Sequence, residues 1–75
     1  MPRKGDVHVV PGDKGWRVEV EGQDRASGTH GTQAAAWEQA KGIAKRNHSE
    51  ALLHGRDRQI RERNTYGHDP RRTKG

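Results

Sequence analysis

The chain contains no cysteine and no phenylalanine, and only nine of its 75 residues are Leu, Ile or Val. Without cysteine, neither a disulfide framework nor a thiolate zinc site can form. So few branched apolar residues exclude a large core, and a chain of this length supports one small domain. Stability therefore has to come from well-placed packing or from association of two copies.

Long apolar runs are also lacking. None approaches the roughly 18 to 20 residues of a membrane span, and the N-terminal MPRKGD lacks the apolar stretch of a secretory signal. We therefore expect a cytoplasmic protein with no membrane partner. Glycine-rich phosphate motifs and a nucleophile elbow are missing too, so we expect no cofactor, no small-molecule substrate and no enzymatic activity.

Apolar and charged residues alternate most clearly in Trp16–Glu21, which predicts a strand with Trp16, Val18 and Val20 facing a core. Val7–Val10 precedes it across a Pro- and Gly-containing loop, so the two segments form a hairpin. Ala26–His30 is a weaker third strand, because Ser, Gly and Thr dominate it, and we place it at an edge.

Good helix formers run from Gln33 to about His48, after Thr32 as the capping residue. One helical stripe carries the apolar residues Ala36, Trp37, Ala40, Ile43 and Ala44. A second hairpin follows, with strands Ala51–His54 and Gln59–Glu62, and it places Ile60 inside.

The order β-β-β-α-β-β predicts an α+β domain of two layers, in which one helix packs on one face of an antiparallel sheet. We assign residues 6–70 to this domain, residues 1–5 to a flexible leader and residues 71–75 to a basic, disordered tail. Tyr66 is expected to pack back onto the domain.

Positive charge is concentrated near the C-terminus, where residues 56–75 hold seven Lys and Arg against three Asp and Glu. Such a cluster favours weak electrostatic contact with DNA or RNA, because arginine pairs well with phosphate oxygens. The basic candidates for this contact are Arg56, Arg58, Arg61, Arg63, Arg71, Arg72 and Lys74, and Tyr66 is the candidate for stacking a base. A solvated basic edge without a partner is the competing interpretation.

A different function follows from the sheet face that the helix does not cover. Val10, Leu52 and His54 lie on that face if alternation holds, opposite Val9 and Leu53. A second copy of the chain could cover this patch, as thin cores often require. The alternative prediction is thus a homodimer or protein-interaction module with no nucleic-acid partner.

Histidine is abundant, with five residues, and His8 and His54 fall on strands that can be neighbours. No pair at metal-ligand spacing and no accompanying carboxylate supports a metal site, so we interpret the histidines as structural or solvated. Asp57, Glu62 and Asp69 lie near His54 in sequence, but so few large apolar residues cannot enclose a catalytic pocket.

The motifs VHVVP, GWRV and AWEQAKGIA, followed by HGRDRQIR and a Tyr-Gly pair, resemble the small bacterial family called domain of unknown function 2188, over roughly Val7 to Pro70. The resemblance implies the same β-β-β-α-β-β domain and implies no activity. Arg58 stands where the family usually has a turn glycine, and the third strand is less apolar than usual.

Overall fold

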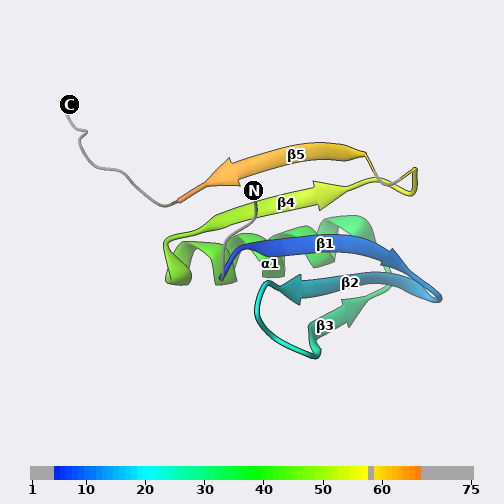
Figure 1. Cartoon of the computed structure of the whole chain (residues 1–75). Coiled ribbons are helices and arrows are strands. Elements are labelled where there is room, and N and C mark those ends of the chain that lie inside the picture. The colour runs from blue at the N-terminus through cyan, green and yellow to red at the C-terminus, as the bar shows by residue number, and fades with distance from the viewer. Residues whose placement is uncertain (1–4, 58, 67–75) are drawn as a thin grey trace.

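The computed structural model describes residues 5–57 and 59–66, and it has one helix and five strands (Figure 1). Their order along the chain is β1 (Val7–Gly12), β2 (Gly15–Val20), β3 (Ala26–His30), α1 (Gln33–Asn47), β4 (Glu50–His54) and β5 (Ile60–Thr65). The α+β class with a single helix is confirmed. The predicted leader is described only at Gly5, and the predicted tail lies outside the described residues.

The sheet has the strand order β3-β2-β1-β4-β5, and it is mixed rather than antiparallel. β1 and β4 are parallel, with Val7 beside Ala51 and Val9 beside Leu53, whereas the other three pairs of neighbours are antiparallel. The prediction of an antiparallel sheet was wrong at this pair. The physical reason is that α1 carries the chain back along the sheet, so β4 runs in the same direction as β3 and β1.

The helix begins and ends with local signals. The Thr32 side chain accepts a hydrogen bond from the Ala35 backbone N–H at 3.2 Å, which satisfies one free donor of the first turn. His48 ends the helix in the left-handed conformation, with φ of 53°, and its N–H bonds back to the last turn. Lys45 and Arg46 in that turn suit the negative end of the helix dipole.

The core lies between α1 and one face of the sheet. It consists of small and medium apolar side chains around two tryptophans: Val7, Val9, Trp16, Val18, Val20, Ala36, Trp37, Ala40, Ala44, Ala51 and Leu53. Ile43 and Tyr66 pack against its margin, which confirms the expected packing of Tyr66. The small alanines bring the helix close to the sheet, and the two tryptophans are the largest side chains of the core.

The first hairpin turns at Gly15, where φ is 141°. A Cβ at this position would collide with the backbone carbonyl oxygen of His30 on β3. Gly15 therefore allows the hairpin tip and the edge strand to approach each other, which no other residue permits.

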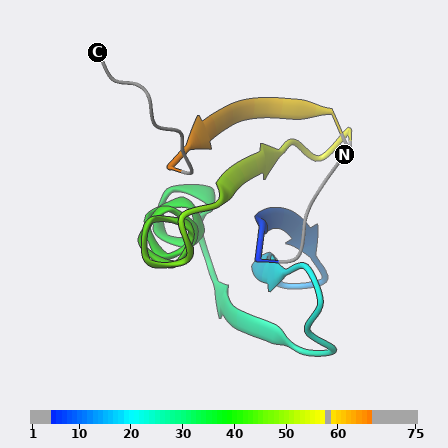
Figure 2. The same cartoon turned by 60° about the vertical axis from the view of Figure 1, so that its left-hand side comes forward.

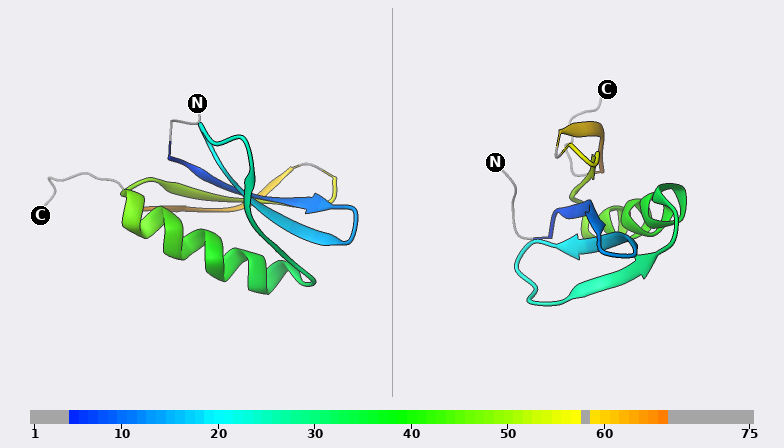
Figure 3. Two further views of the ribbon diagram at one scale, coloured as in Figure 1. Left: turned by 90° about the horizontal axis from the view of Figure 1, so that it is seen from below. Right: turned by 90° about the vertical axis from the view of Figure 1, so that its right-hand side faces the viewer.

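Figure 2 shows α1 on one side of the curved sheet, and Figure 3 confirms that the described residues place no other element over the opposite side. We call this side the open face. Ile60 lies beside His54 on it and is 49% exposed, so the prediction that Ile60 points inside was wrong. A register shift between Leu53 and His54 causes the difference, because it moves Ile60 out of the expected alternation. No helix within residues 5–57 and 59–66 is long and apolar enough to cross a membrane.

Candidate functional site

The open face is organised as three rows of side chains that cross the strands, as the register of the sheet shows. The first row combines two apolar side chains with two basic ones: Arg17, Val10, His54 and Ile60. The middle row has opposite charges at its ends: Glu19, His8, Leu52 and Arg63. The last row is polar and largely acidic: Glu21, Asp6, Glu50 and Thr65. The acidic residues therefore gather at the end of the face where β1 begins, and Val10 and Ile60 lie at the other end.

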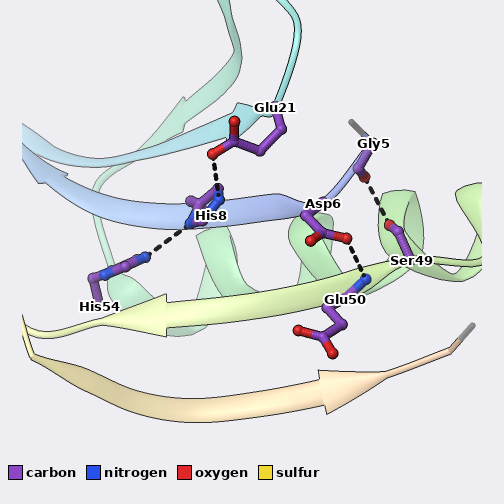
Figure 4. Close-up of polar contacts among 7 residues, drawn as sticks. All are labelled: Gly5, Asp6, His8, Glu21, Ser49, Glu50 and His54. Atoms are coloured by element: carbon purple, nitrogen blue, oxygen red, sulfur yellow. Dashed lines mark hydrogen bonds and ion pairs between the residues drawn. The ribbon is translucent and has the colours of Figure 1, made fainter. Parts of the chain in front are cut away.

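His8 and His54 meet near the centre of this face (Figure 4). Nδ1 of His8 lies 2.9 Å from Nε2 of His54, and the ring centroids are 5.2 Å apart with an interplanar angle of 30°. The two histidines come from adjacent parallel strands. Leu52 lies beside His8, and His54 lies two residues further along β4 on the same face. The prediction that these two histidines occupy neighbouring strands is confirmed.

Glu21 holds the other side of His8. Its Oε2 atom lies 2.9 Å from Nε2 of His8, at ion-pair distance, although the angle is not that of a hydrogen bond in this rotamer. The Glu21 side chain is 41% exposed, so it can rotate to bring its carboxylate into line with Nε2–H of His8. With a proton on Nε2 directed to Glu21, the Nδ1 atom of His8 accepts from Nε2–H of His54.

Burial lowers the pKa of His54 below the ordinary value of 6.5, and the neighbouring His8 lowers it further. Both effects disfavour a second positive charge at the pair. The arrangement therefore favours a neutral His54 that donates or shares one proton with His8 at neutral pH.

Asp6 joins the elements that meet at the acidic end of the face. It is 2% exposed, and its Oδ1 accepts a hydrogen bond from the Glu50 backbone N–H at 3.1 Å (Figure 4). Its carbonyl oxygen accepts from the Glu21 N–H at 2.8 Å, so the same residue fixes both β2 and β4. Beside it, the Ser49 hydroxyl donates to the Gly5 carbonyl at 2.7 Å. These bonds hold the parallel register that brings His8 to His54.

The arginines predicted to grip nucleic acid contact separate partners. Arg56 lies over the Trp16 ring, 5.0 Å from its centroid. Arg61 contacts the Asp57 carboxylate at 3.2 Å. Arg63 lies 3.9 Å from Glu50 on the open face. The two exposed ion pairs contribute little stability, but they show that the charges of Arg61 and Arg63 are balanced locally.

Tyr66, the predicted stacking residue, packs against the core, and its backbone N–H donates to the Ser49 carbonyl at 2.9 Å. Its hydroxyl is 3.4 Å from the Asn64 side chain. The other predicted contact residues, Arg58, Arg71, Arg72 and Lys74, lie outside the described residues.

A shallow hollow of about 330 Å³ borders the histidine pair and is lined by Val10, Pro11, Arg17, Glu19 and His54. Within residues 5–57 and 59–66, no group of three or more His, Cys, Asp or Glu residues is placed to hold a metal ion. The histidine pair of one chain thus offers two nitrogens and an adjacent carboxylate, and no complete site.

Sequence reasoning did not identify Glu21 and Asp6 as members of this cluster. The alternation of β2 placed Glu21 among the solvent-facing residues, which was a usable signal for the face. The missing information was the parallel pairing of β1 with β4, without which His8, His54 and Glu21 have no common location.

Comparison with known proteins adds a family. The model of the family described as "Uncharacterized protein conserved in bacteria (DUF2188)" matches residues 7–66. No curated protein and no solved structure matches the chain significantly.

Proposed function

From the premise that the chain belongs to the bacterial DUF2188 family, we propose that it is a binding module that pairs with a second copy through the open face. The observation that carries this proposal is the self-complementary arrangement of the face. Opposite charges stand at the two ends of its middle row, and half-exposed apolar side chains lie beside that row.

The charges at the two ends of the middle row match under one particular symmetry. Consider a two-fold axis that runs along the strands between β1 and β4, with the two open faces packed together. This axis brings β2 of one copy over β5 of the other, so Glu19 lies opposite Arg63 twice. It also sets Val10 opposite the second copy's His54. The charged ends of the middle row thus meet their opposites in both copies, which favours pairing of the faces about this axis.

The area of the face agrees with a weak dimer. The four strands that overlap, β2, β1, β4 and β5, are about 4.8 Å apart and about six residues long, so at about 3.3 Å per residue they span roughly 19 by 20 Å. The resulting patch is below the roughly 800 Å² per partner of a standard stable interface, even after side-chain relief is allowed for. We therefore expect association in the micromolar range rather than an obligate dimer.

Sedimentation equilibrium of the full chain tests the proposal. We expect a mass approaching twice 8.4 kDa as the concentration rises through the micromolar range. Ile60→Lys puts a positive charge opposite the second copy's Arg17 and should weaken association about tenfold or more, since it also replaces a half-exposed apolar side chain in both copies. Ala35→Lys on the exposed side of α1 is the matched control. A monomer at all concentrations, or equal weakening in both variants, contradicts the proposal.

A second candidate, contact with nucleic acid, is favoured by the distribution of charge. Residues 5–57 and 59–66 hold nine Lys and Arg against nine Asp and Glu, so the net charge of +5 comes entirely from the remaining 14 residues. We propose that a polyanion such as DNA or RNA is met mainly by the charges of residues 1–4 and 67–75 rather than by those of β4 and β5.

Two triple variants of the full chain separate these sources. Replacing Arg71, Arg72 and Lys74 with glutamine should reduce the salt dependence of DNA or RNA affinity. The slope of log affinity against log salt concentration should become shallower by about one for each phosphate that the variant no longer neutralises. Neutralising Arg56, Arg61 and Arg63 is the matched control and should change the slope less. No binding at low salt, or a larger effect of the second set, argues against this candidate.

A further inference from the structure

We propose that a divalent ion of the zinc class binds between two copies of this chain, held by His8 and His54 of each. The inference rests on the proposed pairing of the open faces, and it identifies the ligand at the centre of that interface. A single chain contributes two nitrogens, and the described part of it contains no third ligand in place.

The two-fold axis that matches the charges also gathers the histidines. His8 lies on β1 and His54 lies on β4, two residues further along the strand direction. Exchange of β1 and β4 by the axis therefore sets four imidazoles at the corners of a rectangle, about 4.8 Å by about 6.6 Å at the backbone. Packed sheets are about 10 Å apart, and an imidazole extends about halfway across that gap, so the four rings meet at the middle.

The distance within one pair suits a shared ion. With Zn–N bonds of about 2.0–2.1 Å, two nitrogens on a tetrahedral zinc lie about 3.3 Å apart. The observed separation of Nδ1 of His8 and Nε2 of His54 is 2.9 Å, so a small opening of the pair admits the ion. The ion then takes the place of the proton between the rings, and His54 carries its single proton on Nδ1 instead of Nε2.

Glu21 supplies the second observation. Its carboxylate is 2.9 Å from Nε2 of His8, on the side of the ring away from His54. Ligating histidines usually direct their other ring nitrogen to a carboxylate in this manner, which fixes the ring and strengthens the bond to the metal. Imidazole nitrogens select zinc, nickel or copper ions, whereas Mg²⁺ prefers oxygen ligands.

The test measures dimerisation of the full chain by sedimentation equilibrium with Zn²⁺, with Mg²⁺ and with a chelator. Zn²⁺ at ten times its dissociation constant from the dimer should tighten dimerisation about tenfold. Calorimetry should give one Zn²⁺ per two chains. His54→Gln and His8→Asn, which keep a side-chain nitrogen near the original one, should abolish the zinc effect. Glu21→Gln should weaken zinc binding about 10–100-fold.

His48→Asn is the matched control, because it removes an exposed histidine and asparagine tolerates the left-handed backbone at that position. It should leave the zinc effect intact. A dimer that is indifferent to Zn²⁺ overturns this inference and leaves the proposed function standing. Zinc bound by a chain that stays monomeric, or an equal reduction in His48→Asn and His54→Gln, overturns the inference as well. A monomer that ignores zinc overturns both.

Discussion

Reversal of the charges at Glu19 and Arg63 tests the arrangement of the proposed dimer directly. Glu19→Arg places a positive charge opposite the second copy's Arg63, and the two-fold axis repeats this repulsion. Arg63→Glu produces the corresponding clash of two negative charges. The double variant restores opposite charges at both positions, so we expect each single variant to weaken dimerisation and the combination to recover it.

The expected weakening of dimerisation follows from the solvent exposure of the Glu19 and Arg63 side chains. The Glu19 and Arg63 side chains are 43% and 57% exposed, so each intermolecular pair resembles a surface ion pair and contributes about 0.2–1 kcal/mol. A single reversal removes two such attractions and replaces them with repulsions of similar size. The expected weakening is about 1–3 kcal/mol, which corresponds to roughly 5- to 150-fold in the dissociation constant.

Sedimentation equilibrium at low and high salt measures this weakening, and circular dichroism confirms that each variant is folded. Both residues have exposed partners within the chain, Arg17 for Glu19 and Glu50 for Arg63, so removal of those ion pairs affects the fold little. Glu38→Arg makes the same charge change on the outer side of α1, where the side chain is 76% exposed. The proposed arrangement is contradicted if the double variant dimerises no better than the weaker single variant, or if Glu38→Arg weakens dimerisation as much as Glu19→Arg does.

Three further predictions concern the fold beneath the face. The pKa of His54 in the folded chain lies below 6.5, so its contribution to the free energy of unfolding is complete above pH 6.5 and is lost as the pH falls through the folded pKa. Between pH 7.5 and pH 5, the free energy of unfolding measured in urea should therefore decrease less in His54→Gln than in the wild type. Equal decreases in the two proteins contradict this prediction. Gly15→Ala should cost about 2 kcal/mol or more in urea unfolding, because the added Cβ meets the His30 carbonyl at a positive φ, whereas Gly31→Ala, where a Cβ has open space, should cost less. Asp6→Ala should cost about 1–3 kcal/mol in thermal unfolding by leaving the Glu50 N–H without its acceptor, and an unchanged melting temperature speaks against the role of Asp6 in fixing β4.

The elements that the sequence predicted are those with local signals. Trp16, Val18 and Val20 alternate with charged residues over six positions, and all three are buried. The helix has its capping threonine and a stripe of alanines around Trp37, and these residues face the sheet. Periodicity and capping act over a few residues, so a single sequence carries them in full.

The features that were predicted wrongly depend on residues far apart in the chain. The residues of Val7–Val10 and Ala51–His54 do not indicate whether the two strands pair in parallel or antiparallel. The consecutive burial of Ala51, Leu52 and Leu53 is typical of a strand in the interior of a sheet. Ile60 is outside because one register shift in β4–β5 changes its face. The arginines were grouped by closeness in sequence, but pleat and loop direct them to separate partners.

The excess positive charge of the chain lies outside the residues that form the open face, and this connects the two candidate functions. The described residues are neutral in sum, so pairing of the open faces brings together two chains whose excess positive charge lies in other residues. A dimer then presents two sets of basic residues to one polyanion, and the second contact gains from a high effective concentration. Loss of dimerisation through Glu19→Arg should therefore lower apparent affinity for long DNA, although the variant adds positive charge. Recovery of that affinity in the double variant would show that pairing, and not local charge, controls the binding.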